Sequence, residues 1–517
     1  MATPSDKLAD SLEALHRFQE GGMIAIRSAD LSRTHRERLV QNGFLQEVIK
    51  GWYIPSRPDG TQGESTAWYT SFWQFCSAYL THLRGKNWCL SPEQSIAIHT
   101  GNWTVPKQLL VRADKARNKI TVLPHGTSLL DIRASLPDEQ HVVEKNGVRL
   151  FSLPAALIGS GTQIYRSNPT DMRAALSMID DASQLLEPLL EGGHSAIAGR
   201  MAGAFRNIGR KQIADDILQT MRAAGYDVRE RDPFDTESGL IFSMRESSPY
   251  VNRIRLMWQD MRHTVIQHFP EPPFRKWNVA SYMENIEKIY VSDAYHSLSI
   301  EGYCVTPQLI NRVRSGDWNP EKNQDDNERL NALAARGYWQ AYQAVRQSIE
   351  CILNGQNAGE VVDADHRIWY REMFAPGVTV GIHKPADLAG YRNGQVFIRR
   401  SMHVPPAKEA VRDAMPTFFE LLRDEENAAA RVVLGHFIFI YIHPYMDGNG
   451  RMGRFLMNAM LASGGYPWTI IPLSKRNEYM AALEQASTSQ NIAAFAKFLG
   501  HLVQASLDGK GEPEISD

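Results

Sequence analysis

The chain has 517 residues, enough for about three domains, and a formal net charge of −2 at pH 7. This near-neutral charge argues against a surface that binds nucleic acid or membranes along the whole chain. No stretch approaches the length of a membrane span, and the N-terminus lacks a signal-peptide pattern. The four cysteines lie far apart with no C-x-x-C pair, which offers no zinc site and favours a cytoplasmic protein.

Residues 1–60 predict a small helical domain that ends in a hairpin. Residues 29–41 are expected to form a helix, which Gly43 breaks. Residues 46–54 alternate in polarity around a Lys-Gly turn, as the two strands of a hairpin do. This order is the plan of a winged helix, whose helix would contact DNA through basic side chains. The candidate DNA-binding residues are Arg33, Arg36 and Arg38.

Residues 61–165 predict a small α/β domain with short strands at 108–111, 120–122 and 148–151. Together with the first 60 residues, this region resembles the N-terminal part of AbiEi-type antitoxins. Both share the helix, the hairpin and a G-x-Y pattern before a proline, here Gly51 to Pro55. The resemblance implies a DNA-binding module. A small α/β domain that contacts proteins remains a second interpretation.

Residues 166–270 predict a helical connecting region. Alanine-rich and basic patches alternate between residues 171 and 229, which favours two or three amphipathic helices with a solvated charged face. Asp232-Pro233 and the proline-rich segment 270–273 are typical of linkers. We place the next domain at residues 271–508 and a polar, flexible tail at 509–517.

A long helix is expected at about residues 278–299 of this domain, with Gly302 as its stop. Its apolar residues recur at helical spacing. They are Met283, Ile286, Ile289, Tyr290 and Ala294.

Residues 389–400 predict a short hairpin. Asn393-Gly394 is a tight-turn signal, residues 396–398 are expected to form a strand, and Pro405-Pro406 ends the segment. Taken alone, this pattern is that of an ordinary surface hairpin.

The most informative stretch is the loop at residues 443–454, His-Pro-Tyr-Met-Asp-Gly-Asn-Gly-Arg-Met-Gly-Arg, between two apolar helix-like runs. If a helix begins after Gly448, its free N–H groups and its dipole form an anion site. Arg451 and Arg454 lie on one face of that helix and can fork onto phosphate oxygens. Asp447 is placed to hold Mg²⁺ against those phosphates. His443 can accept a proton near neutral pH.

This loop resembles the Fic family signature, H-x-F-x-[DE]-G-N-G-R-x-x-R, at every fixed position but one, where Tyr445 replaces phenylalanine. The resemblance extends roughly from Phe274 to Leu502. It implies a compact helical domain that transfers AMP from Mg²⁺–ATP to a hydroxyl of a protein target. His443 is implied as the general base and Asp447 as the Mg²⁺ ligand. The implied ATP-binding residues are Gly448, Asn449, Gly450, Arg451, Met452, Gly453, Arg454 and Tyr479.

Residues 297–302, Ser-Leu-Ser-Ile-Glu-Gly, fit the inhibitory pattern of the same family, [ST]-x-x-x-E-[GN]. The pattern implies that Ser297, Glu301 and Gly302 end an inhibitory helix. Glu301 would then pair with Arg454 and occupy the space of the ATP γ-phosphate. The position of this pattern before the signature implies a class II member.

Two further elements carry alternatives. The segment Gln395, Val396, Phe397 and Ile398 resembles the family's flap, which holds a target by strand addition. Tyr479 resembles a tyrosine of the nucleoside pocket, although a helix-packing tyrosine is an equal interpretation. His436 is interpreted as a buried supporting residue and not as a metal ligand.

The expected fold is therefore multidomain, with a mainly α Fic domain and a β-hairpin flap after an α/β winged-helix module. The expected function is a protein adenylyltransferase that Glu301 inhibits. One alternative is hydrolytic removal of AMP, with Glu301 positioning the water. Another is a DNA-binding antitoxin or transcriptional regulator with a Fic sensor domain. The expected partners are ATP, Mg²⁺, a protein with a Ser, Thr or Tyr hydroxyl (the chain itself included) and DNA, but no membrane; a homo-oligomer stays open.

Overall fold

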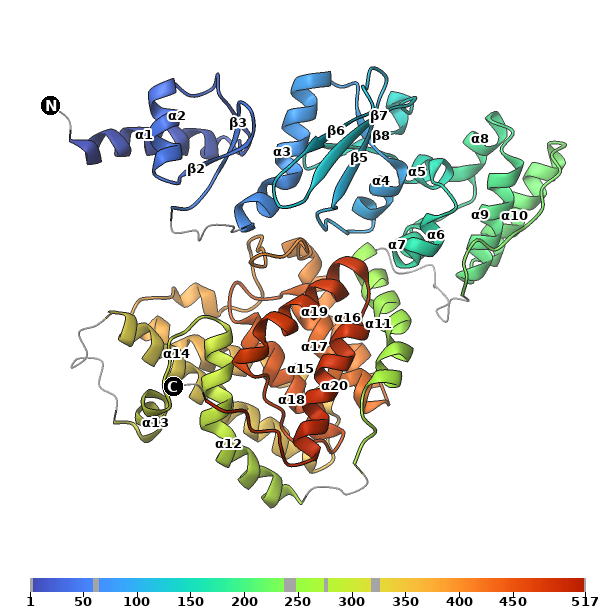
Figure 1. Cartoon of the computed structure of the whole chain (residues 1–517). Coiled ribbons are helices and arrows are strands. Elements are labelled where there is room, and N and C mark those ends of the chain that lie inside the picture. The colour runs from blue at the N-terminus through green and yellow to red at the C-terminus, as the bar shows by residue number, and fades with distance from the viewer. Residues whose placement is uncertain (1–2, 59–64, 237–247, 274–277, 318–325, 516–517) are drawn as a thin grey trace. The chain divides into compact units, whose positions relative to one another are not determined.

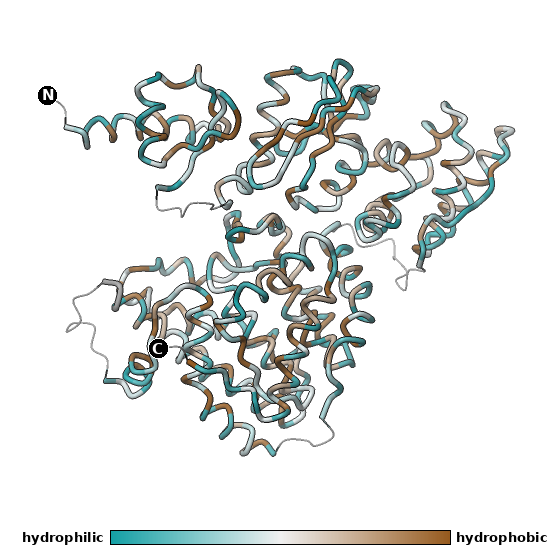
Figure 2. The backbone as a smooth tube through the Cα atoms, in the orientation of Figure 1, coloured by the Kyte–Doolittle hydropathy of each residue, from teal (hydrophilic) through white to brown (hydrophobic). Residues whose placement is uncertain are grey.

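The computed structural model describes residues 3–58, 65–236, 248–273, 278–317 and 326–515 (Figure 1). The chain divides into two compact units, residues 1–249 with 397–404, and residues 250–396 with 405–517. All strands of the described residues lie in the first unit, and the second is built from helices. Apolar stretches run through both units (Figure 2). None of the described helices is long and apolar enough to cross a membrane.

The N-terminal part of the first unit has the expected helix and hairpin. Its helix starts later than residue 29, because Ser32 Oγ accepts a hydrogen bond from His35 N–H and caps the first turn. The hairpin turns at Gly51, whose φ is 82°. A short third strand pairs beside it, in the order β1-β3-β2. The elements are α1 (Pro4–Glu20), β1 (Ile26–Arg27), α2 (Arg33–Gln41), β2 (Leu45–Ile49) and β3 (Trp52–Pro55).

A small α/β fold follows and confirms the three strands expected from the sequence, which are β5, β6 and β9. Its main sheet has the order β4-β5-β7-β6, with β5 and β7 parallel. Buried aromatic residues of α3, among them Trp68 and Phe75, pack in the core beside this sheet. The elements are α3 (Thr66–Arg84), β4 (Cys89–Leu90), α4 (Pro92–His99), β5 (Gln108–Ala113), β6 (Lys119–Val122), β7 (Ser128–Arg133), β8 (Val142–Lys145) and β9 (Val148–Phe151).

Short helices complete the first unit, and residues 171–229 hold four of them in whole or in part, where the sequence predicted two or three. The basic residues are not all on a solvated face. Arg210 is 8% exposed and donates to the carbonyl oxygens of Ser177 and Ile179, so it ties helices together. The elements are α5 (Leu153–Gly159), α6 (Ile164–Ser167), α7 (Pro169–Ser177), α8 (Ser183–Glu191), α9 (Ser195–Asn207) and α10 (Lys211–Ala223).

The second unit is a helical domain around one buried helix, α17. Every residue of α17 except Arg431 is buried, as expected for a helix that is apolar on all sides. Helix α11, which we expected in the connecting region, packs here through Arg253, whose Nε donates to Tyr441 Oη at 2.7 Å. The helices are α11 (Pro249–His268), α12 (Val279–Ile300), α13 (Pro307–Ser315), α14 (Asp326–Leu353), α15 (Ala358–Thr379), α16 (Lys408–Asp424), α17 (Ala428–Ile442), α18 (Asn449–Ser463), α19 (Arg476–Ser489) and α20 (Ala493–Leu507).

Helix α12 confirms the helix expected at 278–299. Asn278 caps its N-terminus by accepting from Ala280 N–H, and Gly302 follows its end with φ 95°. Of its expected apolar face, Ile286, Tyr290 and Ala294 are fully buried. Phe274, where the family resemblance begins, lies outside the described residues.

The expected hairpin at residues 389–400 is wrong, because no strand forms in this segment. The loop is closed by side chains and not by a ladder of backbone hydrogen bonds. Gln395 Nε2 donates to the carbonyl oxygens of Pro405 at 3.0 Å and of Val396 at 3.3 Å. The tight-turn signal therefore marks a loop that has no neighbouring strand to pair with.

Candidate active site

The loop at residues 443–448 joins α17 to α18 through two left-handed residues. His443 ends α17 with φ 52°, and Gly448 precedes α18 with φ 79°. A Cβ on Gly448 would lie 2.7 Å from the Phe374 ring, so both the backbone and the space require glycine. Helix α18 begins at Asn449, as the signature predicts, and presents its free N–H groups at the loop.

Asn449 gives this loop its shape. Its Oδ1 accepts from Tyr445 N–H at 2.9 Å, and its Nδ2 donates to Tyr445 O at 2.8 Å. The sequence suggested that Asn449 offers donors to phosphate, but the structure uses its amide inside the loop. Asn449 is 2% exposed and therefore supports the anion-binding turn from within.

The signature residues separate into two groups. Met452 is 1% exposed and belongs to the core. A Cβ on Gly453 would lie 2.8 Å from Ile440 Cδ1, so Gly453 allows α18 to pack closely on α17. These two residues face the domain interior, whereas Gly450 faces the end of α12.

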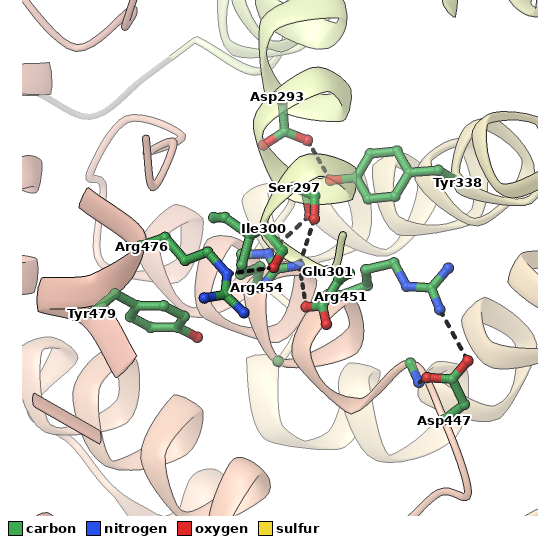
Figure 3. Close-up of polar contacts among 12 residues, drawn as sticks. Asp293, Ser297, Ile300, Glu301, Tyr338, Asp447, Arg451, Arg454, Arg476 and Tyr479 are labelled. Atoms are coloured by element: carbon green, nitrogen blue, oxygen red, sulfur yellow. Dashed lines mark hydrogen bonds and ion pairs between the residues drawn. The ribbon is translucent and has the colours of Figure 1, made fainter. Parts of the chain in front are cut away.

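Arg451 is held between two rings. Its guanidinium lies 5.2 Å from the Tyr303 ring centroid and 5.1 Å from that of Phe374. Asp447 lies beside it, with 3.6 Å between Arg451 Nη2 and Asp447 Oδ2 (Figure 3). The Asp447 side chain is 64% exposed, which leaves its carboxylate accessible to solvent.

Arg454 connects α18 to the end of α12. Its Nη2 donates to Glu301 Oε1 at 2.7 Å and to Ser297 O at 2.9 Å, and its Nε donates to Ser297 Oγ at 2.9 Å (Figure 3). The Arg454 side chain is 5% exposed and that of Glu301 is 30% exposed. Burial opposes ionisation of Glu301, but the charges of Arg454 and Arg451 outweigh it and lower the pKa of this carboxyl.

The Glu301 carboxylate lies directly on the first turn of α18. A Cβ on Gly450 would lie 2.1 Å from Glu301 Oε1, so only glycine leaves room for this approach. A carboxylate at a helix N-terminus and on an arginine occupies the kind of position that a phosphate prefers.

A buried polar cluster one turn of α12 before Ser297 was not predicted from the sequence. Asp293 Oδ2 accepts from Tyr338 Oη at 2.6 Å, and its Oδ1 accepts from Trp468 Nε1 at 2.9 Å. Burial raises the pKa of Asp293 to about 6. Arg476 was also missed, and its Nε donates to Ile300 O at 2.8 Å, which fastens the end of α12 (Figure 3). Asp293 lies one turn before Ser297 on an otherwise apolar face, which is the only local signal for it.

His443 has the protonation pattern of a base. Its Nδ1 lies 3.2 Å from Ile440 O, and because a carbonyl oxygen only accepts, Nδ1 carries the proton and Nε2 keeps its lone pair. Burial lowers the pKa of His443 to about 4. The ring is therefore neutral at physiological pH and can accept a proton at Nε2.

Tyr479 is 2% exposed, and its hydroxyl lies 2.7 Å from His436 Nε2. His436 Nδ1 lies 2.8 Å from Gly453 O and must donate to it, so Nε2 accepts from Tyr479. This arrangement agrees with the packing interpretation of Tyr479 and with the supporting role of His436. A contact of Tyr479 with a nucleoside stays a prediction.

Tyr445, the one departure from the signature, is fully buried and stacks on Tyr370 with 3.8 Å between ring centroids. Its hydroxyl has no hydrogen-bond partner in the described part of the chain. A buried hydroxyl without a partner costs about 1–3 kcal/mol.

We therefore expect Tyr445→Phe to raise the free energy of unfolding by about 1 kcal/mol. Tyr479→Phe is the matched control, because it removes a hydroxyl that is bonded to His436 and should lower stability by a similar amount. Urea denaturation of the two variants checks this. A loss of stability in Tyr445→Phe would show that the hydroxyl has a partner.

The predicted DNA-binding arginines are mostly engaged within the first unit. Arg38 Nη1 donates to Lys7 O at 2.7 Å and to Ser11 Oγ at 2.8 Å, and Arg36 Nη1 donates to Ser28 O at 2.8 Å. Arg33 pairs with Glu37 on the surface, and its side chain is 83% exposed. Arg38 thus ties α2 to α1, Arg36 ties α2 to the turn after β1, and DNA binding by this helix stays a prediction.

No group of three or more His, Cys, Asp or Glu side chains that could hold a metal lies within the described ranges. Mg²⁺ usually takes one or two carboxylates and completes its shell with phosphate oxygens and water. The exposed Asp447 carboxylate fits this mode, in which the ion arrives with a nucleotide.

Comparison with known proteins agrees with this geometry. Residues 366–461 match the model of the Fic/DOC family. The chain is 29% identical over 229 residues to a protein adenylyltransferase Fic of Nematostella vectensis, covering 43% of this chain and 49% of the relative. It is 28% identical over 228 residues to the protein of that name from Drosophila virilis, covering 43% of each chain. It thus spans less than half the length of these relatives.

Among solved structures, Fic-1 (aa134–508) from C. elegans aligns at 18% identity with a TM-score of 0.37. The alignment covers 63% of this chain and 91% of that one.

Proposed function

We propose that the second unit is a protein adenylyltransferase, which transfers AMP from ATP to a hydroxyl of a protein. The observation that carries the proposal is the shared placement of a neutral His443 and of two arginines around the N-terminus of α18. The similarity to two proteins named protein adenylyltransferase Fic supports it.

In the proposed reaction, the target hydroxyl gives its proton to His443 Nε2 while its oxygen attacks the α-phosphorus. The bond from the α-phosphorus to the bridging oxygen breaks, and pyrophosphate leaves. The α18 N-terminus with Arg451 and Arg454 binds the phosphates, and Asp447 would hold Mg²⁺, which neutralises phosphate charge. Positioning and charge stabilisation supply most of the rate in such transfers.

We further propose that the chain is held inactive by Glu301. The carboxylate pairs with Arg454 and covers Gly450, so the triphosphate and Glu301 compete for one arginine and one helix turn. ATP would then bind with its γ-phosphate displaced. The place of Glu301 before the signature is that of a class II arrangement.

ATP labelled at either end tests the reaction type. Incubation of the Glu301→Gly chain with Mg²⁺ and α-labelled ATP should label protein, whereas γ-labelled ATP should not, because pyrophosphate leaves. Label carried from the γ-phosphate would show a kinase-type reaction and contradict the proposal. Omission of Mg²⁺ should abolish the α-label if Asp447 holds the ion.

A second candidate uses the same site in the hydrolytic direction. The Glu301 side chain is 30% exposed and its charge acts on His443, and these are the features that would let it orient a water toward an AMP-modified protein. Release of AMP from a modified target by wild type but not by Glu301→Gly would favour this direction.

A further inference from the structure

One buried arginine near the site is bound entirely by backbone carbonyls. Arg392 is 1% exposed, and its Nε donates to His443 O at 2.8 Å. Its Nη1 donates to Gly394 O at 3.0 Å, and its Nη2 donates to Pro406 O. The backbone N–H of Arg392 also donates to Pro444 O at 2.9 Å. Among the described residues, it forms no ion pair with a carboxylate.

A guanidinium buried without an ion-pair partner is costly, and burial lowers the pKa of Arg392 to about 10, although the charge of Glu409 raises it. The group is still charged at neutral pH. The C-terminal end of α17 offsets part of this cost. The carbonyl oxygens of Ile442 and His443 lie at that end, where the helix dipole is negative.

The contacts of Arg392 join two segments that catalysis must bring together. One is the turn at His443, whose φ of 52° is unfavourable for a residue with a Cβ. The other is the loop from Gly394 to Pro406, which at both ends accepts a hydrogen bond from the same guanidinium through a carbonyl oxygen. That loop contains the residues that resemble a target-binding flap.

We propose that Arg392 is a positioning residue. Its guanidinium holds the backbone of His443, the catalytic histidine, and the two ends of the loop from Gly394 to Pro406 in a fixed arrangement. This inference rests on the proposed transferase function for its catalytic meaning. We expect this role to require the planar guanidinium as well as its positive charge. A lysine ammonium cannot reach three carbonyl oxygens that lie apart in one plane.

The charge of Arg392 gives an independent readout at His443. Burial is the main cause of the low pKa of His443, and Arg392 lowers it further, whereas Glu301 and Asp447 raise it. Removing the Arg392 charge should therefore raise this pKa, and replacing arginine by lysine should leave it nearly unchanged. A residue that only filled space would shift this pKa in neither variant.

The test compares Arg392→Gln and Arg392→Lys in the full chain. NMR of ring-labelled histidine follows the titration of His443, assigned by its loss in His443→Ala. We expect Arg392→Gln to raise the pKa by about one unit. Arg412→Gln is the matched control, since exposed Arg412 donates to Asn393 of the same loop and, among the described residues, forms no hydrogen bond with the His443 turn. A pKa of His443 that is unchanged in folded Arg392→Gln would overturn the inference.

The second readout is AMP transfer in the Glu301→Gly background. Arg392→Lys should lower kcat about tenfold to a hundredfold with little change in KM for ATP, because the nucleotide site is intact and the base is displaced. Transfer by Arg392→Lys at the parent rate would overturn the inference even if Arg392→Gln does not fold. If the Glu301→Gly parent itself transfers no AMP, the proposed function fails, while the His443 titration still decides the role of Arg392.

Discussion

Replacing Glu301 with glycine should raise AMP transfer by one to several orders of magnitude. The substitution removes the carboxylate that pairs with Arg454 at 2.7 Å and clears the first turn of α18 above Gly450. A pair that contributes ~3 kcal/mol to the closed state accounts for roughly a hundredfold shift in population. Transfer of label from α-labelled ATP to protein measures the gain.

Two controls make this result specific. Adding Arg454→Ala to Glu301→Gly should remove the gain in AMP transfer. The gain depends on the Arg454 guanidinium, which loss of Glu301 frees to bind ATP. Glu284→Ala removes an exposed carboxylate of the same helix, paired with Lys288, and should leave transfer unchanged. If Glu301→Gly is no more active than wild type, Glu301 is not inhibitory or the enzyme works mainly as a hydrolase.

Replacing His443 with alanine should lower transfer by about 10²–10⁴-fold while ATP binding changes little. The reason is that His443 Nε2 is the proposed acceptor of the hydroxyl proton, whereas the proposed phosphate-binding groups lie on α18. The comparison is best made in the Glu301→Gly background, with transfer and nucleotide affinity measured separately. His501→Ala, an exposed histidine of α20, is the control.

The low pKa of His443 adds a pH dependence to this second prediction. Because the base must be deprotonated and its pKa is about 4, transfer should stay level from neutral pH downward and fall only as pH approaches that value. Loss of activity centred near the ordinary histidine pKa would show that the ring is not held as described. Parent rate in His443→Ala would remove it from the mechanism.

The sequence predicted those parts of the site that follow from local rules. Glycine at 448 marks a left-handed turn, and the polar loop between two apolar runs marks the junction of α17 and α18. The spacing of apolar residues located α12, and its motif put Glu301 at its end, where the structure pairs it with Arg454.

The rest depended on contacts between distant segments. The strand at 396–398 did not form, because the loop is closed by side-chain bonds from Gln395 to Pro405 and from Arg392 to Gly394 and not by pairing with a neighbouring strand. Arg392 carries no sequence signal of its own, and Asp293 only its place on an apolar helix face, because their partners are carbonyls and rings elsewhere in the chain. The bond from Arg38 to Lys7 of α1 also joins distant segments, and DNA binding by Arg38 stays a prediction.

A crystal structure of the chain with Mg²⁺–ATP, for wild type and Glu301→Gly, would show whether Glu301 and the γ-phosphate compete for Arg454. In wild type we expect Glu301 to stay on Arg454 and the γ-phosphate to lie elsewhere. In Glu301→Gly the γ-phosphate should lie on Arg454, with the α-phosphorus open to attack beside His443. A γ-phosphate on Arg454 in wild type, or an unchanged triphosphate pose in the variant, would contradict this competition.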